Sequence, residues 1–531
     1  MKKHNVKLLA ALALSTMILA GCAGQGTTTP TTPSGTSAPT AAETKDEVVI
    51  GISAEPATLD PHIQSGQATR LIKQNIYRGL MSYQPDNSKA MELAEKIELQ
   101  ADGITYKVTL KDGLKFHDGS NVTSEDVKYS IDRILNPDSK ATFGADFRLM
   151  VEKVEVVDAK VSNIILKKPS TPFLDMLALP ETVIVSKAWF ENSANDPAIN
   201  AMGNGPYVFE SWDKGREIKV TAFADFYKEG KPESKALRFV FYTDNATRAN
   251  ALRSGDVDII DYVPSNEAIA FESAKDAVVD ISVAPIMLLQ FNVKTGPLAD
   301  PKVRQAIAYA IDREGVISAA FMGRGIPIYG FPTLKGQNGY DGKYDNFFTE
   351  DLTKAKALLA EAGYADGFKI KILATSTYDM HKQTALVVQS SLKAIGIDAE
   401  VDLPDWATRI SRSNVGDYEI LVSGTTGNIL DMDWVTNYYA SGEPRMNSSA
   451  WFADDEIDKL LEEGRTTVEE AERAVIYDKF RLRALELSPF VFINYREQIF
   501  AMSDKVKGFQ NMDGILTYTS GITLENTTVA K

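Results

Sequence analysis

Residues 283–313 read VAPIMLLQFNVKTGPLADPKVRQAIAYAIDR, and this stretch decides the fold. Its first third is almost continuously apolar, which predicts a strand over residues 283–293 that is buried inside a sheet. Asp300 then provides a carboxylate for an N-cap, and Pro301 suits the first helical position, where its missing N–H is harmless. A helix is therefore predicted to begin at Pro301.

The predicted helix extends to Arg313. Val303, Ile307 and Ile311 recur every four residues and give the helix one apolar stripe. A buried strand that turns once into a helix with a new face to bury is typical of a chain that passes between two domains. The alternative, one more strand–helix pair inside a single domain, is equally compatible with this stretch alone.

The N-terminus has the pattern of an export signal. A basic start is followed by an apolar run from Leu8 to Leu19, which is too short to span a bilayer. Small residues precede Cys22, an arrangement similar to the lipobox of bacterial lipoproteins. We expect a signal peptide over residues 1–21 and a lipid on Cys22. The alternative is ordinary signal cleavage with an incidental cysteine.

Residues 22–45 are rich in Thr, Pro, Ser, Gly and Ala and contain almost no large apolar side chain. Such a segment cannot bury enough surface to offset its conformational entropy. It is predicted to be a disordered tether that holds a folded body near a membrane.

Length, charge and cysteine content exclude several classes of protein. A chain of 531 residues far exceeds the roughly 250–300 residues at which a single core stops growing, so at least two domains are expected. The formal net charge of −15 argues against nucleic acid as a partner. Cys22 is the only cysteine, so no intramolecular disulfide and no catalytic thiol is expected in the body.

The remaining patterns predict three groups of elements. Strands near residues 48–52, 208–210, 218–222 and 237–242 are expected to share one sheet. Residues 80–201 are expected to form an inserted α+β unit with a hairpin at 106–119 and a capping box at Thr123 and Asp126. After Arg313, strand 368–373, helix 381–394 and strand 397–401 predict a parallel pair with a right-handed crossover.

Several motifs together resemble the family 5 extracellular solute-binding proteins, the peptide and nickel binders of ABC importers. The helix at 301–313 resembles the signature helix of that family. Other segments follow in the order of the family: Leu59-Asp60-Pro61, Asn75-Ile76-Tyr77-Arg78-Gly79-Leu80, Phe116-His117-Asp118-Gly119, Gly203-Asn204-Gly205-Pro206-Tyr207 and Leu252-Arg253-Ser254-Gly255-Asp256-Val257-Asp258. The resemblance covers about residues 47–500.

The resemblance implies an α/β, three-lobed fold like that of periplasmic binding proteins (type II, cluster C), with a discontinuous first domain and a ligand cleft between lobes. The implied boundaries are 46–79, 202–288 and 495–531 for the first domain, 80–201 for the second domain, and 289–494 for the third domain. These three names are kept below for these residue ranges.

The resemblance also implies a function without catalysis or cofactor. A small solute, expected to be an oligopeptide or dipeptide, would be enclosed between the first and third domains and delivered to the permease and ATPase subunits of an importer. Ligand contacts that only the closed form completes would shift the population toward that form. A sugar, an opine-like compound or a metal chelate is the alternative solute. The protein would act as a monomer outside the cytoplasm, anchored to the cell membrane.

Peptide-binding relatives pair the α-ammonium of the ligand with an aspartate in the third domain. Asn428 occupies that position here and supplies no charge, while Asp431 follows as the acidic residue of the motif. Asp431 or Asp433 is a substitute if the loop is shifted, and the alternative for both is a solvated turn carboxylate.

Further ligand contacts are expected from the same part of the chain. Trp406 matches a family tryptophan, either for stacking on the ligand or for packing. Arg409 and Arg412 are candidates for binding a carboxylate, although surface arginines are common. The remaining expected contacts are Gly424, Thr425, Thr426 and Gln67.

Enzyme and metal-site hypotheses have weaker support. Ser390-Ser391-Leu392-Lys393 and Lys294-Thr295-Gly296 match motifs of tethered penicillin-binding proteins, but their order in the chain is reversed. A tethered hydrolase is therefore the competing class. The four histidines are scattered without ligand spacing, so no metal-binding residue is predicted, and a ligand-wrapped metal stays open.

Overall fold

The computed structural model describes residues 43–63, 66–333 and 341–531. The predicted signal peptide at 1–21, Cys22 and the tether up to residue 42 lie outside the described residues, and Glu43–Lys531 form one compact unit. Within the described chain, no helix combines the length and apolar character that a membrane crossing requires.

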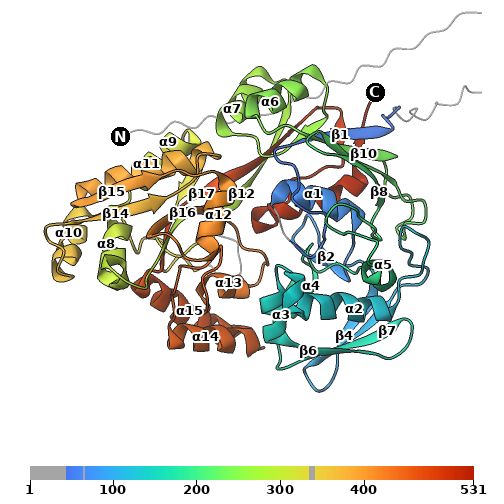
Figure 1. The fold of residues 1–531 in the computed structure, drawn as a ribbon, viewed down its shortest axis with the longest axis horizontal. Helices are drawn as coiled ribbons and strands as arrows, with labels where there is room; N and C mark the ends of the chain where they lie inside the picture. The colour runs from blue at the N-terminus through green and yellow to red at the C-terminus, as the bar shows by residue number, and fades with distance from the viewer. Residues whose placement is uncertain (1–42, 64–65, 334–340) are drawn as a thin grey trace, which may run out of the picture. The chain divides into compact units, whose positions relative to one another are not determined.

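An eleven-stranded sheet runs through the described residues (Figure 1). Its order is β15-β14-β16-β12-β17-β11-β1-β10-β9-β8, and β13 pairs with β17 outside this path. The strands are β1 (Glu47–Ile52), β8 (Tyr207–Asp213), β9 (Glu217–Ala222), β10 (Ala236–Phe241), β11 (Ile259–Ile260), β12 (Val278–Phe291), β13 (Gly325–Pro327), β14 (Phe368–Leu373), β15 (Ile397–Asp402), β16 (Ile420–Thr425) and β17 (Phe490–Met502). The prediction that β1 shares a sheet with β8, β9 and β10 is confirmed.

Two long strands connect the first-domain part of the sheet with the third-domain part (Figure 1). β12 and β17 pair antiparallel along most of their length, and the register shifts between Val283 and Ile286 and again between Met287 and Leu288. On one side of these shifts β17 pairs with β11, and on the other side β12 pairs with β16. The strand predicted over 283–293 therefore begins earlier than expected, because its first residues pair with the first domain.

The helix after β12 is shorter than predicted. α8 (Pro301–Ala310) begins as expected, with the Asp300 carboxylate accepting a hydrogen bond from the Lys302 N–H at 2.8 Å. It ends at Ala310, with Ile311 as its C-cap, and not at Arg313, because Asp312 caps a second helix, α9 (Arg313–Phe321). The Ile311 side chain remains fully buried, so the apolar stripe was recognised correctly and the end of the helix was not.

The second domain contains a four-stranded sheet in the order β4-β5-β7-β6 within the described residues. The capping box of Thr123 and Asp126 is confirmed at the start of α2. The predicted hairpin over 106–119 is wrong, because the first strand pairs with β4 and β7, and only one isolated bridge joins Lys115 to Asn121. The elements are β2 (Met81–Tyr83), β3 (Lys89–Met91), β4 (Ala94–Leu99), β5 (Thr105–Leu110), β6 (Val151–Val156), β7 (Val161–Leu166), α2 (Ser124–Leu135), α3 (Gly144–Met150), α4 (Phe173–Leu177) and α5 (Lys187–Glu191).

The third domain has the predicted α/β pattern. β14 and β15 are parallel and in register from Phe368↔Ile397 to Leu373↔Asp402, with α11 between them in the chain, as expected.

The helices not yet named belong to the first and third domains. They are α1 (Gln67–Ile76), α6 (Asn245–Ser254), α7 (Ser265–Ala274), α10 (Leu352–Glu361), α11 (Asp379–Ala394), α12 (Trp406–Asn414), α13 (Thr436–Tyr439), α14 (Asp455–Thr466) and α15 (Glu470–Leu487). Short 3-10 turns η3 (Met432–Val435) and η4 (Gly514–Asn526) and the small strands β18 (Val506–Lys507) and β19 (Thr528–Val529) complete the elements used below.

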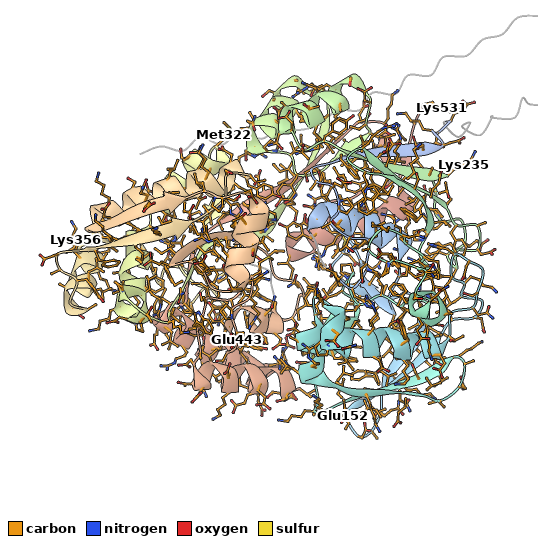
Figure 2. The ribbon with its side chains drawn as sticks, viewed as in Figure 1. Glu152, Lys235, Met322, Lys356, Glu443 and Lys531 are labelled. Atoms are coloured by element: carbon orange, nitrogen blue, oxygen red, sulfur yellow. The ribbon has the colours of Figure 1, made fainter. Side chains whose placement is uncertain are left out.

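Apolar side chains collect in separate clusters, the largest of them around β12, α8, α11 and β17 in the third domain. A second cluster lies under the four-stranded sheet, and a third lies around β1, β10 and α1. Charged side chains such as Glu152, Lys235, Lys356 and Glu443 point outward (Figure 2). The domain boundaries themselves stay a prediction.

Candidate functional site

The loop that follows β16 is the structural centre of the site. β16 lies between β14 and β12 and pairs with β12 in the register Thr425↔Ile286, so its last residue lies at the register shift of β12. We call residues 424–428 the loop; Gly424 and Thr425 are the last two residues of β16, so this buried central strand fixes where the loop starts.

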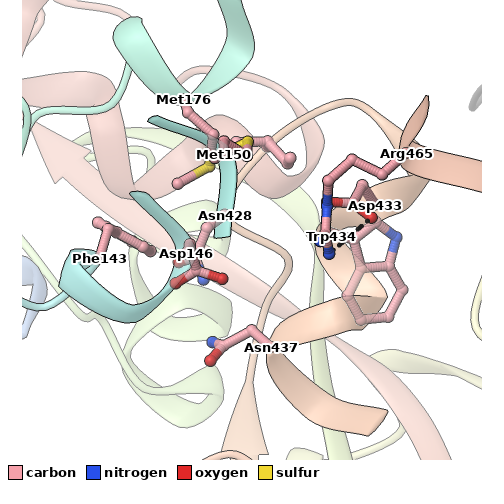
Figure 3. A pocket seen from close by; sticks show the side chains of 10 residues that line it. Phe143, Asp146, Met150, Met176, Asn428, Asp433, Trp434, Asn437 and Arg465 are labelled. Carbon is pink, nitrogen blue, oxygen red and sulfur yellow. Dashed lines mark hydrogen bonds and ion pairs between the residues drawn. The ribbon is translucent and has the colours of Figure 1, made fainter. Parts of the chain in front are cut away.

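The far end of this loop lines a pocket between the second and third domains (Figure 3). α3 and α4 of the second domain supply an apolar wall, and the segment around η3 supplies polar groups. The lining residues are Phe143, Asp146, Met150, Met176, Asn428, Ile429, Asp433, Trp434, Asn437 and Arg465.

Two carboxylates in the pocket have different environments. Asp433 is buried, and it is paired with Arg465 at 3.1 Å and accepts a hydrogen bond from Thr436 at 2.8 Å. Burial raises the pKa of Asp433, and Arg465 opposes that rise. Asp433 is therefore a structural partner of Arg465, and it adds a negative field to the pocket.

Asp146 is the second carboxylate. Its side chain is half-buried and takes part in no side-chain hydrogen bond or ion pair among the described residues. Burial and, next, repulsion by Asp433 raise the pKa of Asp146 to about 6. Asp146 and Asn428 both line the pocket (Figure 3). The pocket thus holds a carboxylate without a side-chain partner among the described residues.

Asn428 lines the pocket, whereas the Asp431 side chain is engaged in contacts with its own part of the chain. Its carboxylate caps η3 by accepting a hydrogen bond from the Asp433 N–H at 2.8 Å and is paired with Arg473. Both interactions fix the backbone that follows the loop. The Asp431 side chain does not line the pocket.

The near end of the loop lies against a group of aromatic and cationic side chains that we call the hinge cluster. Gly424 is at this end, where an added Cβ would lie 3.3 Å from Nε2 of His381 and 3.0 Å from Sδ of Met287. The hinge cluster consists of Tyr262, Tyr378, His381, Trp406, Arg409, Arg496 and Tyr518.

Ring contacts connect the two domains within the hinge cluster. Tyr262 follows β11 in the first domain and stacks on Tyr378 of the third domain with ring centroids 6.4 Å apart. Tyr378 meets Trp406 edge-on at 5.1 Å, and His381 meets Trp406 at 5.9 Å. The predicted Trp406 therefore belongs to an aromatic group that spans the two domains.

Arg409 packs against the Trp406 ring of this group and is 1% exposed. It donates to the Val422 carbonyl at 3.1 Å and to Oγ of Ser423 at 3.0 Å, and its guanidinium lies 5.1 Å from the Trp406 ring. Burial lowers the pKa of Arg409 to about 10. Burial, followed by the charges of Arg409 and Arg496, lowers the pKa of His381 to about 3, so this histidine is neutral.

The two threonines of the loop contact Tyr438 of α13. The hydroxyls of Thr425 and Tyr438 are 2.6 Å apart, and Tyr438 donates to the Thr426 carbonyl at 2.8 Å. The Thr426 hydroxyl is buried and has no hydrogen-bond partner among the described residues.

Arg412 and Gln67 complete the predicted set. Arg412 forms ion pairs with Asp402 at 2.6 Å and Asp417 at 2.8 Å, which places its charge in a surface network. Gln67 is the first residue of α1 and 6% exposed, and within the described chain neither amide atom of its side chain has a partner. The expected loop position of Gln67 is thus the start of a helix.

The loop also touches the other two domains. The Leu430 N–H donates to the Tyr83 hydroxyl at 3.3 Å, and a Cβ at Gly427 would lie 3.4 Å from the Ile515 side chain. The Thr171 N–H donates to the Arg465 carbonyl at 3.0 Å. The site therefore lies where residues of all three domains meet.

Sequence reasoning missed Asp146 and Arg496. Neither residue has a local motif, because each reaches the site only through the long-range packing of separate elements. Among the described residues, no group of three or more potential ligands is placed to hold a metal ion.

Comparisons with known proteins identify the family. The model of the bacterial extracellular solute-binding proteins, family 5, matches residues 90–447. The glutathione-binding protein GsiB of Pectobacterium atrosepticum is 28% identical over 481 residues, which is 88% of this chain and 92% of that protein. The structure of the periplasmic binding protein AgaA from A. tumefaciens R10, in complex with agropinic acid, is 46% identical with a TM-score of 0.87, over 91% of this chain and 99% of that chain.

A further structure agrees in fold. The periplasmic binding protein DppA of Helicobacter pylori, in complex with the peptide STSA, has a TM-score of 0.83 and 24% identity, over 91% of this chain and 98% of that chain. The α/β fold of periplasmic binding proteins expected from the sequence is confirmed. The chain belongs to the family 5 bacterial extracellular solute-binding proteins, which are receptors outside the cytoplasm that bind a solute and deliver it to the permease of an ABC importer.

Proposed function

We propose that this chain captures one small solute along the loop at residues 424–428 and delivers it unaltered to an importer. The observation that carries the proposal is that this loop has one end in the hinge cluster and the other end in a pocket lined by the second and third domains. A solute lying along the loop would contact the first and third domains at once, so binding would favour the form in which they meet.

A short peptide is the first candidate solute. GsiB and DppA are described as binding glutathione and a peptide, respectively. In this chain the Asp146 carboxylate, which has no side-chain partner within the described residues, lines the same pocket as Asn428 and offers the negative charge that a ligand ammonium requires. The backbone of the loop and the exposed pocket edge would accept side chains of different kinds.

An opine-like solute is the second candidate, favoured by a specific observation. AgaA, whose structure contains agropinic acid, is 46% identical to this chain, whereas the DppA structure is 24% identical. Asn428 carries no charge, so it suits a polar solute without an ammonium group at that point.

Mass spectrometry of the solute retained through gentle purification distinguishes the two candidates. We expect one small molecule per chain, released intact on unfolding. Recovery of peptides supports the first candidate, and recovery of only non-peptidic solute refutes it.

The competing hydrolase hypothesis predicts turnover that depends on Ser390. Ser390 is exposed on α11, and the Lys294 ammonium lies 3.9 Å from the centre of the Trp451 ring. We expect Ser390→Ala to bind and return the same unaltered solute as the unmodified protein. Product formation that this substitution abolishes would support the hydrolase instead.

The lipid anchor and the monomeric state are part of the proposal. We expect Cys22→Ala to move the protein from the membrane fraction to the soluble fraction without loss of solute binding. Light scattering of the soluble body should give the mass of one chain.

A further inference from the structure

The side chain of Arg496 is buried on β17, at the point where that strand passes between the first and third domains. It is 3% exposed. Its hydrogen bonds go only to side chains: to Oε1 of Gln498 at 3.2 Å, to Oη of Tyr262 at 3.1 Å and to Oη of Tyr518 at 2.9 Å. Its Nε has no partner among the described residues.

No carboxylate within the described chain forms an ion pair with Arg496. The neighbouring Glu497 is paired with Arg324 instead. A buried guanidinium without an acidic partner carries a large desolvation cost unless something else offsets its charge. The phenol oxygens of Tyr262 and Tyr518 offer Arg496 hydrogen-bond acceptors and no carboxylate.

Other buried arginines show what a structural role looks like in this protein. Arg70 is paired with Glu181, and Arg78 is paired with Glu525. Arg304 and Arg313 form no ion pair with an acidic side chain in the described ranges, but each donates to several backbone carbonyls. In the described part of the chain Arg496 donates to no carbonyl, so the hydrogen bonds seen there can all rearrange by rotation of side chains.

The residues around Arg496 border accessible space. The side chains of Tyr262, Tyr378 and Tyr518 are each half-buried and partly open to solvent, whereas the side chain of Arg496 is buried. Tyr262 and Tyr518 both accept a hydrogen bond from Arg496, and each phenol keeps its own O–H, which can donate to a ligand. The guanidinium of Arg496 and the tyrosine hydroxyls beside it are hydrogen-bond donors that lie close together. Such a set of donors suits a planar anion such as a carboxylate.

We propose that Arg496, Tyr262 and Tyr518 form the anchor for a carboxylate of the solute. This inference rests on the proposed function and deepens it, because it requires an acidic solute. A peptide with a free C-terminus and an opine acid both satisfy it. An ion pair formed here on binding supplies the counter-charge that Arg496 lacks.

The test compares acid and amide forms of the same probe by titration calorimetry, with protein that has been unfolded and refolded to remove retained solute. The probes are the peptide Ser-Thr-Ser-Ala and agropinic acid, each with its carboxamide derivative. We expect the acid of at least one pair to bind the unmodified protein at least tenfold more tightly than its amide, because only the acid forms a charge-assisted hydrogen bond.

Arg496→Gln should bind that acid about as weakly as the amide, and Arg496→Lys should keep part of the preference. The matched control is Arg216→Gln, which removes an exposed arginine from the β8–β9 turn and should keep the full preference. If Arg496→Gln does not fold, Tyr518→Phe provides the second variant, with a severalfold loss for the acid and none for the amide.

Equal binding of acid and amide by the unmodified protein overturns the anchor while the receptor function stands. A folded Arg496→Gln protein that keeps the acid preference overturns it as well. If no probe in either form binds the unmodified protein, the proposed solute classes and the anchor fail together.

Discussion

Asp146 illustrates how a single residue in the pocket affects stability and binding in opposite directions. Its pKa of about 6 exceeds the value of an unperturbed aspartate, because burial and Asp433 both disfavour the ionised form. The ionised carboxylate therefore costs stability in the absence of solute. The same unsatisfied charge is available to a cationic group of a ligand.

We expect Asp146→Asn to change how stability depends on pH. A carboxyl whose folded-state pKa is raised takes up a proton on folding, so its penalty is absent below about pH 4 and complete above about pH 6. The variant should unfold at the same temperature as the unmodified protein near pH 4. At pH 7 it should be more stable by roughly 1–3 kcal/mol.

Thermal unfolding of solute-free protein at a series of pH values measures this effect. Asp225→Asn, which changes an exposed aspartate, is the control and should show no such trend. A difference between Asp146→Asn and the unmodified protein that is equal at pH 4 and pH 7 would contradict the assignment.

Asn428 gives a second prediction at the same scale. Asn428→Asp places an acid at the position that the family resemblance assigns to the ligand ammonium, and it should strengthen binding of Ser-Thr-Ser-Ala about tenfold, since charged hydrogen bonds are roughly twice as strong as neutral ones. The N-acetylated peptide lacks the ammonium and should gain nothing. Equal gains for both peptides, measured by calorimetry, would show that Asn428 does not face an ammonium.

The sequence predicts the candidate site unevenly at the residue scale. Asn428 lines the pocket, and Trp406, Arg409 and Gly424 lie in or against the hinge cluster, because each is carried by a local pattern in one element. Arg412 lies in surface ion pairs, and which of the predicted residues hold the solute stays a prediction.

Other features of the site depend on packing that no local pattern records. Asp146 enters the pocket from α3 of the second domain, and Arg496 meets Tyr518 only because η4 packs beside β17 and β12. The residues that supply uncompensated charge were therefore the ones that sequence reasoning did not find.

At the element scale, the turn at residues 203–207 joins two elements at close range. Asn204 accepts a hydrogen bond from the Arg78 N–H at 2.7 Å and donates to the Ile184 carbonyl at 3.0 Å. A Cβ at Gly203 would lie 2.0 Å from the carbonyl oxygen of Ile76, at the end of α1. Only glycine permits this approach.

Gly203→Ala should consequently destabilise the protein by more than about 3 kcal/mol, since backbone atoms must move to relieve the overlap. Gly215→Ala is the matched control: its Cβ would meet no atom within 4 Å, and its positive φ alone should cost about 1 kcal/mol. Urea unfolding of both variants tests this, and similar losses for the two would contradict the close contact.

Elements with strong end signals were predicted well from the sequence. Asp300 and Pro301 fix the start of α8, and Thr123 with Asp126 fix the start of α2. The far end of α8 was missed because the apolar stripe continues through Ile311 while the backbone already turns to begin α9. An apolar period shows which side chains are buried, and it does not show where a helix is interrupted.

At the scale of the whole molecule, β12 and β17 are the physical connection between the first and third domains. Both strands are hydrogen-bonded to each other on either side of the register shifts, so the sheet continues through the connection. A bulged two-stranded connection bends more easily than a broad sheet, and it is where motion between the domains is expected to concentrate. The hinge cluster lies at this point and is where a solute would bias that motion.

Small-angle X-ray scattering tests the central claim most directly. Protein freed of retained solute by unfolding and refolding is measured alone and again with a saturating amount of the solute recovered in that step. We predict that the radius of gyration falls when the solute returns and that the recovered solute has an unchanged mass. Identical scattering curves with the solute fully bound would contradict the claim that it binds by drawing the domains together.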